Sequence, residues 1–310
     1  MKISLVTPAG PGTRNGNRHT ALRWASFLRA AGHRVTVATR DISSEADLML
    51  ALHARRSHES ILAFWRNHPT RRIVLALTGT DVYRDIHLSG EAQESLERAD
   101  RLIVLQPKAA EELAPRLRGK VRVVVQSSST RLRHHPVKDA FRLCIVGHLR
   151  EEKDPLLALA ALRFLSKPDI QVVQIGELLD PKLKPVTKDR RYRWLGGVPH
   201  ARALRWLATS HAMIISSRME GGANVVCEAI RIGVPVLASY ISGNVGLLGE
   251  RYAGYFAPGD EAALAALIMK VQSKGSLYRT LKRQVASLRP MVAPRSEARA
   301  LLTAVTRDIP

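Results

Sequence analysis

The chain has 310 residues, and its 48 Lys and Arg against 27 Asp and Glu give a formal net charge of +21. With 45% hydrophobic and 24% charged residues, the composition excludes disorder for the bulk of the chain. The length predicts two domains, because single hydrophobic cores stop growing at about 250–300 residues. The excess of cations favours phosphate-rich partners, whether nucleic acid, a membrane surface or phosphorylated small molecules.

The positive charge is shared about evenly by the two halves of the chain, and aromatic residues make up only 5%. Because no helix-turn-helix, zinc-finger or RNA-recognition signature accompanies the charge, we expect no nucleic-acid partner. No apolar run approaches the roughly 20 residues of a membrane-spanning helix. The two cysteines, Cys144 and Cys227, lie in different halves and form no disulfide framework. We therefore expect a cytoplasmic protein without stable membrane insertion.

Apolar, β-branched runs alternate with amphipathic segments along the whole chain, which is typical of an α/β fold with parallel sheets. The clearest helix is predicted at residues 19–31, where Gly32 ends it. Strands are predicted at residues 3–7, 34–38, 47–52, 73–77, 102–105, 121–125, 143–147, 172–175, 213–216, 234–238 and 254–256.

The segment 127–140 has no sustained periodicity and is the predicted domain boundary. We expect an N-terminal Rossmann-like domain at residues 1–136 and a C-terminal one at residues 137–294. Residues 295–310 are predicted to contain a helix that crosses back to the N-terminal domain. Two doubly wound domains in series would face each other across a cleft at the carboxyl ends of their strands, where open α/β sheets bind ligands.

The strongest local motif has two carboxylates, Glu220 and Glu228, separated by seven residues between a predicted strand and a predicted helix. Glycines let backbone amides approach a ligand closely, and a helix N-terminus attracts phosphate. The carboxylates are suited to accept hydrogen bonds from a sugar and from a ribose. A glycine-rich turn with two solvated glutamates remains an alternative. The residues between strand and helix are Gly221, Gly222, Ala223 and Asn224.

A second motif follows the strand that is predicted near residues 141–147, where Gly147 and His148 precede Arg150 and Lys153. The two cations would lie near the carboxyl end of this strand. There they could neutralise a diphosphate leaving group, and such contacts strengthen in a cleft without water. A pair of surface charges is the alternative.

These motifs resemble those of the retaining GT-B glycosyltransferases of family four, and the resemblance covers nearly the whole chain. Glu220 and Glu228 match that family's E-x7-E pair, and 147–153 matches its G-R-L-x-x-x-K segment with His148 in place of the arginine. The resemblance implies that Lys153 binds the nucleotide diphosphate and Glu228 the ribose. It also implies that Glu220, with the backbone amides of 221–224, binds the transferred sugar. Lys153 and Glu220 are thus the candidate catalytic residues, and we hypothesise that Arg150 replaces the missing arginine.

Segments 11–18, 51–57, 77–81 and 220–228 together resemble the selenosugar synthases of selenoneine biosynthesis. This resemblance implies a transferase that joins selenophosphate to the anomeric carbon of a UDP-sugar. The donor would be UDP-N-acetylglucosamine, the product a 1-seleno-sugar, and UDP and phosphate would be released. UDP-sugar and selenophosphate are then the small-molecule partners.

The predicted acceptor site lies at strand ends of the first domain and would hold an oxyanion through guanidinium groups. Selenophosphate is already anionic and nucleophilic, so it needs no general base. As alternatives, the arginines of the first loop point to water, and Thr78 and Asp81 only cap the following segment. The candidate acceptor residues are Arg14, Gly16, Asn17, Arg18, Arg55, Thr78 and Asp81.

Neither a metal nor another cofactor is expected, because no histidine pair has metalloprotease spacing and no cysteine cluster is present. Two other functions remain open on sequence alone. One is an ordinary GT-B hexosyltransferase with a hydroxyl or lipid-linked acceptor. The other is a basic nucleic-acid-binding protein with a degenerate transferase fold.

Overall fold

The computed structural model describes residues 1–12, 16–40, 45–79 and 81–306, which form two compact units. The first unit comprises Met1–Gln126 and the C-terminal segment from Pro294, and the second comprises Ser127–Ala293. The units divide at Gln126, before the boundary at residue 136 that the sequence pattern predicts. The intervening segment goes with the second unit because its backbone bonds there: Ser128 N–H donates to the Val292 carbonyl at 3.2 Å.

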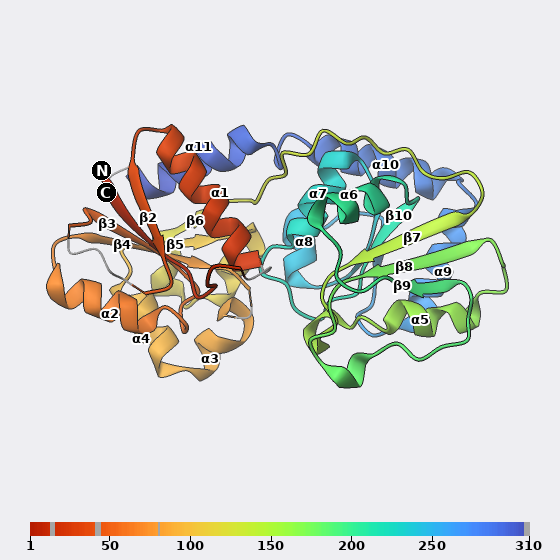
Figure 1. The fold of residues 1–310 in the computed structure, drawn as a ribbon, viewed down its shortest axis with the longest axis horizontal. Helices are drawn as coiled ribbons and strands as arrows, with labels where there is room; N and C mark the ends of the chain where they lie inside the picture. The colour runs from red at the N-terminus through yellow and green to blue at the C-terminus, as the bar shows by residue number, and fades with distance from the viewer. Residues whose placement is uncertain (13–15, 41–44, 80, 307–310) are drawn as a thin grey trace. The chain divides into compact units, whose positions relative to one another are not determined.

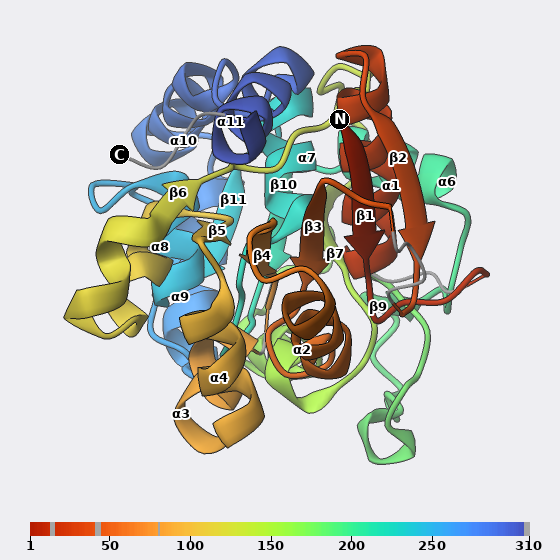
Figure 2. The same ribbon diagram turned by 90° about the vertical axis from the view of Figure 1, so that its left-hand side faces the viewer.

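Parallel strands form a 6-stranded sheet in the first unit. Figure 2 shows them side by side in the order β2-β1-β3-β4-β5-β6. Strand β3 is buried along its whole length, as expected of a parallel strand covered on both faces. The strands are β1 (Lys2–Val6), β2 (Arg34–Ala38), β3 (Leu48–Leu52), β4 (Arg72–Leu77), β5 (Arg101–Val104) and β6 (Val121–Val123).

Helices cover both faces of this sheet (Figure 1). One hydrophobic cluster joins the strands to α1 and α11, and a second joins them to α2 and α4. The helices of the unit are α1 (Gly16–Ala30), α2 (His58–Asn67), α3 (Ile86–Leu88), α4 (Gly90–Arg98) and α11 (Pro294–Thr306).

The last helix, α11, is held on the first unit by a buried carboxylate. Glu297 is 1% exposed and accepts a hydrogen bond of 2.7 Å from the indole N–H of Trp24 on α1. Arg23 Nε lies 2.9 Å from the same carboxylate. Arg101 Nη1 on β5 donates to backbone carbonyls of α11 at 3.2 Å. The end of the chain therefore completes the core around Trp24.

The second unit contains another parallel 6-stranded sheet, in the order β12-β11-β10-β7-β8-β9. In Figure 1, α6 and α7 lie on one face and α5 and α9 on the other. Its strands are β7 (Phe141–Val146), β8 (Ile170–Ile175), β9 (Tyr192–Trp194), β10 (Ala212–Ile215), β11 (Val236–Ser239) and β12 (Tyr255–Phe256). Its helices are α5 (Leu157–Ala161), α6 (His200–Ala208), α7 (Asn224–Ile232), α8 (Ser242–Leu248), α9 (Glu261–Gln272) and α10 (Ser276–Leu288).

The two sheets confirm the predicted fold class of two Rossmann-like units. Each sheet has a topological switch point, where the chain leaves the first strand in both directions. In the first unit this point lies between β1 and β3, and in the second between β7 and β10. Loops that follow these strands are separated there, so each switch point is the expected position of a ligand.

No helix in the described part of the chain is long and apolar enough to cross a membrane. Both cysteines are buried and neither forms a disulfide, and burial raises the pKa of the Cys144 thiol to about 12. Cys144 is therefore protonated at neutral pH and carries no nucleophilic thiolate.

Replacement of Glu297 by Ala is expected to lower the free energy of unfolding by about 2–4 kcal/mol, because it leaves the buried Trp24 N–H and Arg23 without this acceptor. Urea unfolding of the variant measures the loss. Glu45→Ala is the matched control, since Glu45 forms an exposed ion pair with Lys2 in the same unit. Equal stabilities of the two variants would contradict the proposed role of Glu297 in anchoring α11.

Candidate active site

The second unit brings Lys153 and Glu220 together at its switch point. Lys153 ends a short helical turn after β7, and Glu220 lies in the loop after β10. The Lys153 ammonium contacts Glu220 Oε1, and Ser217 Oγ donates to the same oxygen at 2.7 Å. Glu220 is only 8% exposed. Two motifs 67 residues apart thus form one ion pair at the carboxyl edge of the sheet.

The loops that carry this pair are tied to each other by hydrogen bonds. Ser216 Oγ donates to the carbonyls of Lys153 and Asp154 at 3.0 and 2.8 Å. Arg218 donates its backbone N–H to the Glu152 carbonyl at 2.9 Å, and its Nε lies 3.1 Å from Asp154 Oδ2. The loop after β10 therefore fixes the backbone of the turn that carries Lys153.

Glycine is required at position 243, close behind Glu220. A Cβ atom on Gly243 would lie 1.9 Å from the Glu220 carbonyl oxygen, which no side chain can tolerate. Next to it, Ser239 Oγ donates to the Ser217 carbonyl at 2.5 Å. Gly243 and Ser217 are not among the residues that the sequence motifs predict, because their importance comes from contacts between segments that are distant in sequence.

A pocket of the second unit opens beside the ion pair. Apolar side chains of β7 and β10 line it, and its polar side chains are Lys153, Gln174, Ser216, Ser217 and Glu220. The turn of Gly221, Gly222 and Ala223 leads into α7, so the positive end of that helix dipole lies beside the turn. Such a pocket is suited to bind an anion together with hydroxyl groups.

Glu228 lies one turn inside α7 and pairs with a different residue. Its carboxylate is 2.7 Å from His200 Nε2, at the start of α6. Its side chain is 14% exposed, whereas that of His200 is 60% exposed. The two glutamates of the motif therefore have separate partners, and Glu228 does not line the pocket of Lys153 and Glu220.

His148 and Arg150 also lie outside the residues that line this pocket. His148 Nδ1 accepts a hydrogen bond of 3.1 Å from the Glu177 backbone. Arg150 Nη1 lies 3.2 Å from Glu152, and its side chain is 42% exposed. Of the predicted cations after β7, Lys153 alone lies in the pocket.

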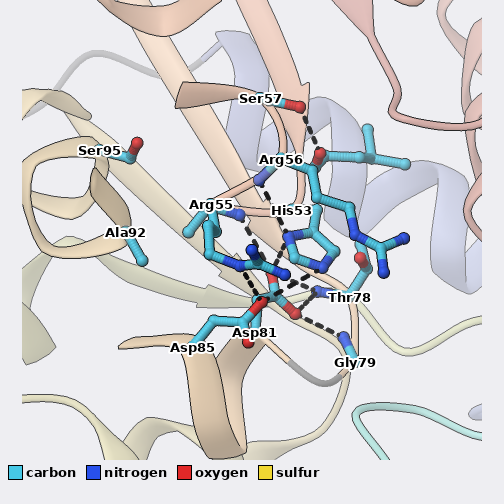
Figure 3. A network of polar contacts seen from close by, with 12 residues as sticks. His53, Arg55, Arg56, Ser57, Thr78, Gly79, Asp81, Asp85, Ala92 and Ser95 are labelled. Carbon is cyan, nitrogen blue, oxygen red and sulfur yellow. Dashed lines mark hydrogen bonds and ion pairs between the residues drawn. The ribbon is translucent and has the colours of Figure 1, made fainter. Parts of the chain in front are cut away.

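The first unit has a second polar network at the ends of β3 and β4 (Figure 3). Asp81, fully buried, accepts backbone N–H bonds from Thr78, Gly79 and Ala54 at 3.0, 2.7 and 3.2 Å. It thereby joins the loop after β3 to the loop after β4. The Thr78 hydroxyl is buried and has no hydrogen-bond partner in the described part of the chain.

Next to Asp81, a buried histidine lies beside a second carboxylate. His53 is 3% exposed, and its Nε2 is 3.7 Å from Asp85 Oδ2. Burial lowers the pKa of His53, against the opposing effect of Asp81, so the imidazole is neutral at pH 7. Burial would raise the pKa of Asp85, but hydrogen bonds from Arg55 and Arg84 outweigh it and hold the pKa below its ordinary value.

The predicted acceptor residues therefore fall into two groups. Arg55, Thr78 and Asp81 lie in the network of Figure 3, with Asp81 turned to the backbone. Gly16, Asn17 and Arg18 form the first turn of α1, where Thr20 Oγ1 donates to the Gly16 carbonyl at 2.9 Å. Arg14 lies outside the described residues. Among the described residues, no group of three or more His, Cys, Asp and Glu side chains is placed to hold a metal ion.

Comparison with known proteins identifies the fold and the family. Residues 129–287, slightly more than half of the chain, match the family described as Glycosyl transferases group 1. The chain belongs to this family. The chain is also 24% identical over 276 residues to the Glycosyltransferase 1 domain-containing protein 1 of Xenopus tropicalis, which covers 77% of this chain and 79% of the relative.

Solved structures show the same architecture. Anabaena HepE in complex with UDP matches with a TM-score of 0.76 and 17% identity, over 96% of this chain and 98% of HepE. Sucrose-phosphate synthase of Thermosynechococcus elongatus matches with a TM-score of 0.73 and 16% identity, over 96% of both chains. The predicted GT-B fold and the predicted glycosyltransferase class are thereby confirmed.

Gly243→Ala is expected to lower transferase activity about a hundredfold, since the new methyl group must displace Glu220 from its position. Turnover and thermal unfolding are measured on the same preparation. Gly90→Ala serves as the control, because no atom lies within 4 Å of a Cβ added at Gly90. Full activity of a folded Gly243→Ala protein would show that the position of Glu220 does not matter for turnover.

Proposed function

We propose that this glycosyltransferase joins selenophosphate to the anomeric carbon of a UDP-sugar, with UDP-N-acetylglucosamine as the expected donor. The product is a 1-seleno-sugar of selenoneine biosynthesis, and UDP and phosphate are released. Three observations support the proposal: the family, the segments 11–18, 51–57, 77–81 and 220–228, and the chemistry of the two polar sites. The donor class is also supported by HepE, which was solved with UDP and with UDP-glucose.

The observation that carries the donor side of the proposal is the contact between Lys153 and Glu220 in the pocket of the second unit. We assign the diphosphate to Lys153, whose positive charge stabilises the negative charge that develops on the leaving UDP. Glu220 and the amides of 221–224 then bind the sugar. Glu228 binds the ribose hydroxyls in place of its present partner, His200, whose side chain is 60% exposed. Arg150 and His148 remain candidates for a second diphosphate contact.

The acceptor side of the proposal rests on the hydrogen bonds that two carboxylates of the first unit, Asp81 and Asp85, accept. Asp81 accepts three backbone hydrogen bonds, and the pKa of Asp85 is lowered by its arginine partners. Neither carboxylate is therefore suited to remove a proton from a hydroxyl acceptor. Arg18, Arg55 and Thr78 can instead hold an oxyanion, and Arg14 is assigned to the same task. An acceptor whose nucleophilic atom is already anionic fits these residues best.

In the proposed step, the selenium lone pair forms the Se–C bond at the anomeric carbon while the bond from that carbon to the diphosphate oxygen breaks. The electron pair of the broken bond leaves with UDP. Water then cleaves the P–Se bond, so that phosphate is released and a selenol remains on the sugar. No redox partner is needed, because neither phosphorus nor selenium changes its oxidation state in this step.

The proposal predicts that UDP release from UDP-N-acetylglucosamine depends on selenophosphate and yields a 1-seleno-sugar. The measurement incubates the purified protein with a panel of UDP-sugars and continuously generated selenophosphate, followed by mass spectrometry and UDP quantification. Absence of a selenosugar under active selenophosphate supply would refute the proposal. Selenophosphate-independent UDP release with an alcohol or lipid-linked acceptor would instead indicate the ordinary hexosyltransferase that the family also allows.

Lys153→Ala is expected to lower kcat/KM for the donor about a hundredfold to a thousandfold, because it removes the cation assigned to the developing charge on UDP. Glu220→Gln removes the carboxylate and is expected to lower kcat as well. Lys184→Ala is the matched control, since Lys184 is exposed and lies in the same unit outside the pocket. Steady-state kinetics against UDP-sugar concentration decides the assignment, which is wrong if Lys153→Ala behaves like the control.

A further inference from the structure

We propose that the buried carboxylate of Asp85 positions Arg55 to bind the phosphate oxygens of the acceptor, and that His53 supports Asp85 in this task. The inference rests on the proposed function, since it concerns the oxyanion acceptor of that reaction. Asp85 and His53 act through Arg55, so both are positioning residues.

Asp85 holds Arg55 through one nitrogen of its guanidinium group. Asp85 is 5% exposed and ends the π-helical turn Asp81–Asp85 that follows β4. Its Oδ2 accepts a hydrogen bond of 3.0 Å from Arg55 Nε, the nitrogen nearest the main chain. Within the described residues, neither terminal nitrogen of Arg55 forms a hydrogen bond, and the side chain is 41% exposed. The end of the guanidinium therefore remains available for two parallel bonds to an oxyanion.

His53 turns a protonated ring nitrogen toward Asp85. The Arg56 backbone N–H donates to His53 Nδ1 at 3.4 Å, so the proton of the neutral ring resides on Nε2. Nε2 is buried, has no hydrogen-bond partner among the described residues, and faces Asp85 Oδ2 at 3.7 Å. A shift of about 1 Å would close this gap to a hydrogen bond. His53 is thus placed to hold Asp85 when Arg55 turns toward an anion.

His53 also has an unusual backbone conformation. Its φ is 75°, in the left-handed region that side chains other than glycine seldom adopt. Such residues cluster at functional sites, where the surrounding structure maintains them. In the described part of the second unit, Asp154 has a φ of 43° and directly follows Lys153 of the donor pocket. Each unit therefore has a residue of this kind beside its polar site.

The polar groups around Arg55 also favour an anion. The Thr78 hydroxyl, buried and without a partner in the described chain, offers a donor at the end of the adjacent strand β4. Asp81 keeps the two loops joined through backbone bonds and has no part in ligand binding in this arrangement. His53 is neutral, so the positive charges of Arg55, Arg56 and Arg84 outnumber the negative charges of Asp81 and Asp85. An oxyanion at Arg55 and Thr78 would balance this charge.

The test is a double-mutant cycle of Arg55→Ala, Asp85→Asn and the double variant, with KM for selenophosphate as the readout. Each single variant is expected to raise this KM about tenfold to a hundredfold, the effect of one charge-assisted hydrogen bond. The double variant is expected to resemble Arg55→Ala, because Asp85 acts only through Arg55. KM for the UDP-sugar should stay unchanged. Additive effects of the two changes, or an unchanged selenophosphate KM in Asp85→Asn, would overturn the inference.

Controls separate positioning from a general loss of structure. Glu97→Gln breaks the ion pair of Glu97 with Arg116, which is exposed in the same unit, and should leave both KM values unchanged. His53→Asn, which tolerates the left-handed backbone, is expected to raise the selenophosphate KM without adding to the effect of Asp85→Asn. A fall in thermal stability with no change in KM would assign His53 and Asp85 a purely structural task and overturn the inference.

A binding measurement keeps the inference separate from the proposed reaction. Calorimetric titration with thiophosphate and with inorganic phosphate is carried out on the wild-type protein, Arg55→Ala and Asp85→Asn. Binding by the wild type that is weakened in both variants supports the anion site even if selenophosphate is not turned over, in which case the proposed function alone fails. Turnover of selenophosphate with equal KM in all three proteins leaves the proposed function standing and refutes the inference.

Discussion

The parallel arrangement of both sheets is the constraint on which the rest of the structure depends. Because every strand in the described sheets points the same way, the loops after the strands meet at one edge of each sheet. The interiors of strands such as β3 are apolar on both faces and leave no room for polar chemistry. The polar residues of both units accordingly follow strands: Lys153, Glu220, His53 and Asp81. At the switch points, the loops that follow neighbouring strands are far enough apart to admit a ligand.

In each unit a poorly exposed carboxylate holds a cation at this edge. Glu220 pairs with Lys153 and also accepts a bond from Ser217, while Asp85 pairs with Arg55 and Arg84. Removing such charges from water is costly, and the attraction within the pair offsets that cost only with good geometry and further hydrogen bonds. The cations are therefore ordered without substrate. A phosphate group that binds later gains from a charge already in place.

The sequence predicted most strands within a few residues, because buried parallel strands are long apolar runs with glycine or polar residues at their ends. It missed β9, because this strand has the sequence Tyr-Arg-Trp, with no β-branched residue and an arginine at its centre. It also identified Lys153 and Glu220, since both belong to a local motif. It could not identify Ser217, Gly243 or Asp85, because each matters through a contact with a segment that folding brings near. The sequence also places segment 127–136 in the first domain, because it cannot show that the backbone of this segment donates to carbonyls of the second unit.

The net charge of +21 has a physical consequence beyond the two sites. In the first unit alone, exposed pairs such as Lys2 with Glu45 and Arg116 with Glu97 already engage acidic side chains, so the basic excess remains as uncompensated surface charge. Such a field attracts anions and increases their rate of encounter with the protein. The UDP-sugar and the oxyanion acceptor of the proposed reaction are both anions, so the field would favour the arrival of both. Two such anions repel each other, and a fixed cation where each one binds, such as Lys153 or Arg55, would offset this repulsion in a way that a diffuse surface charge does not.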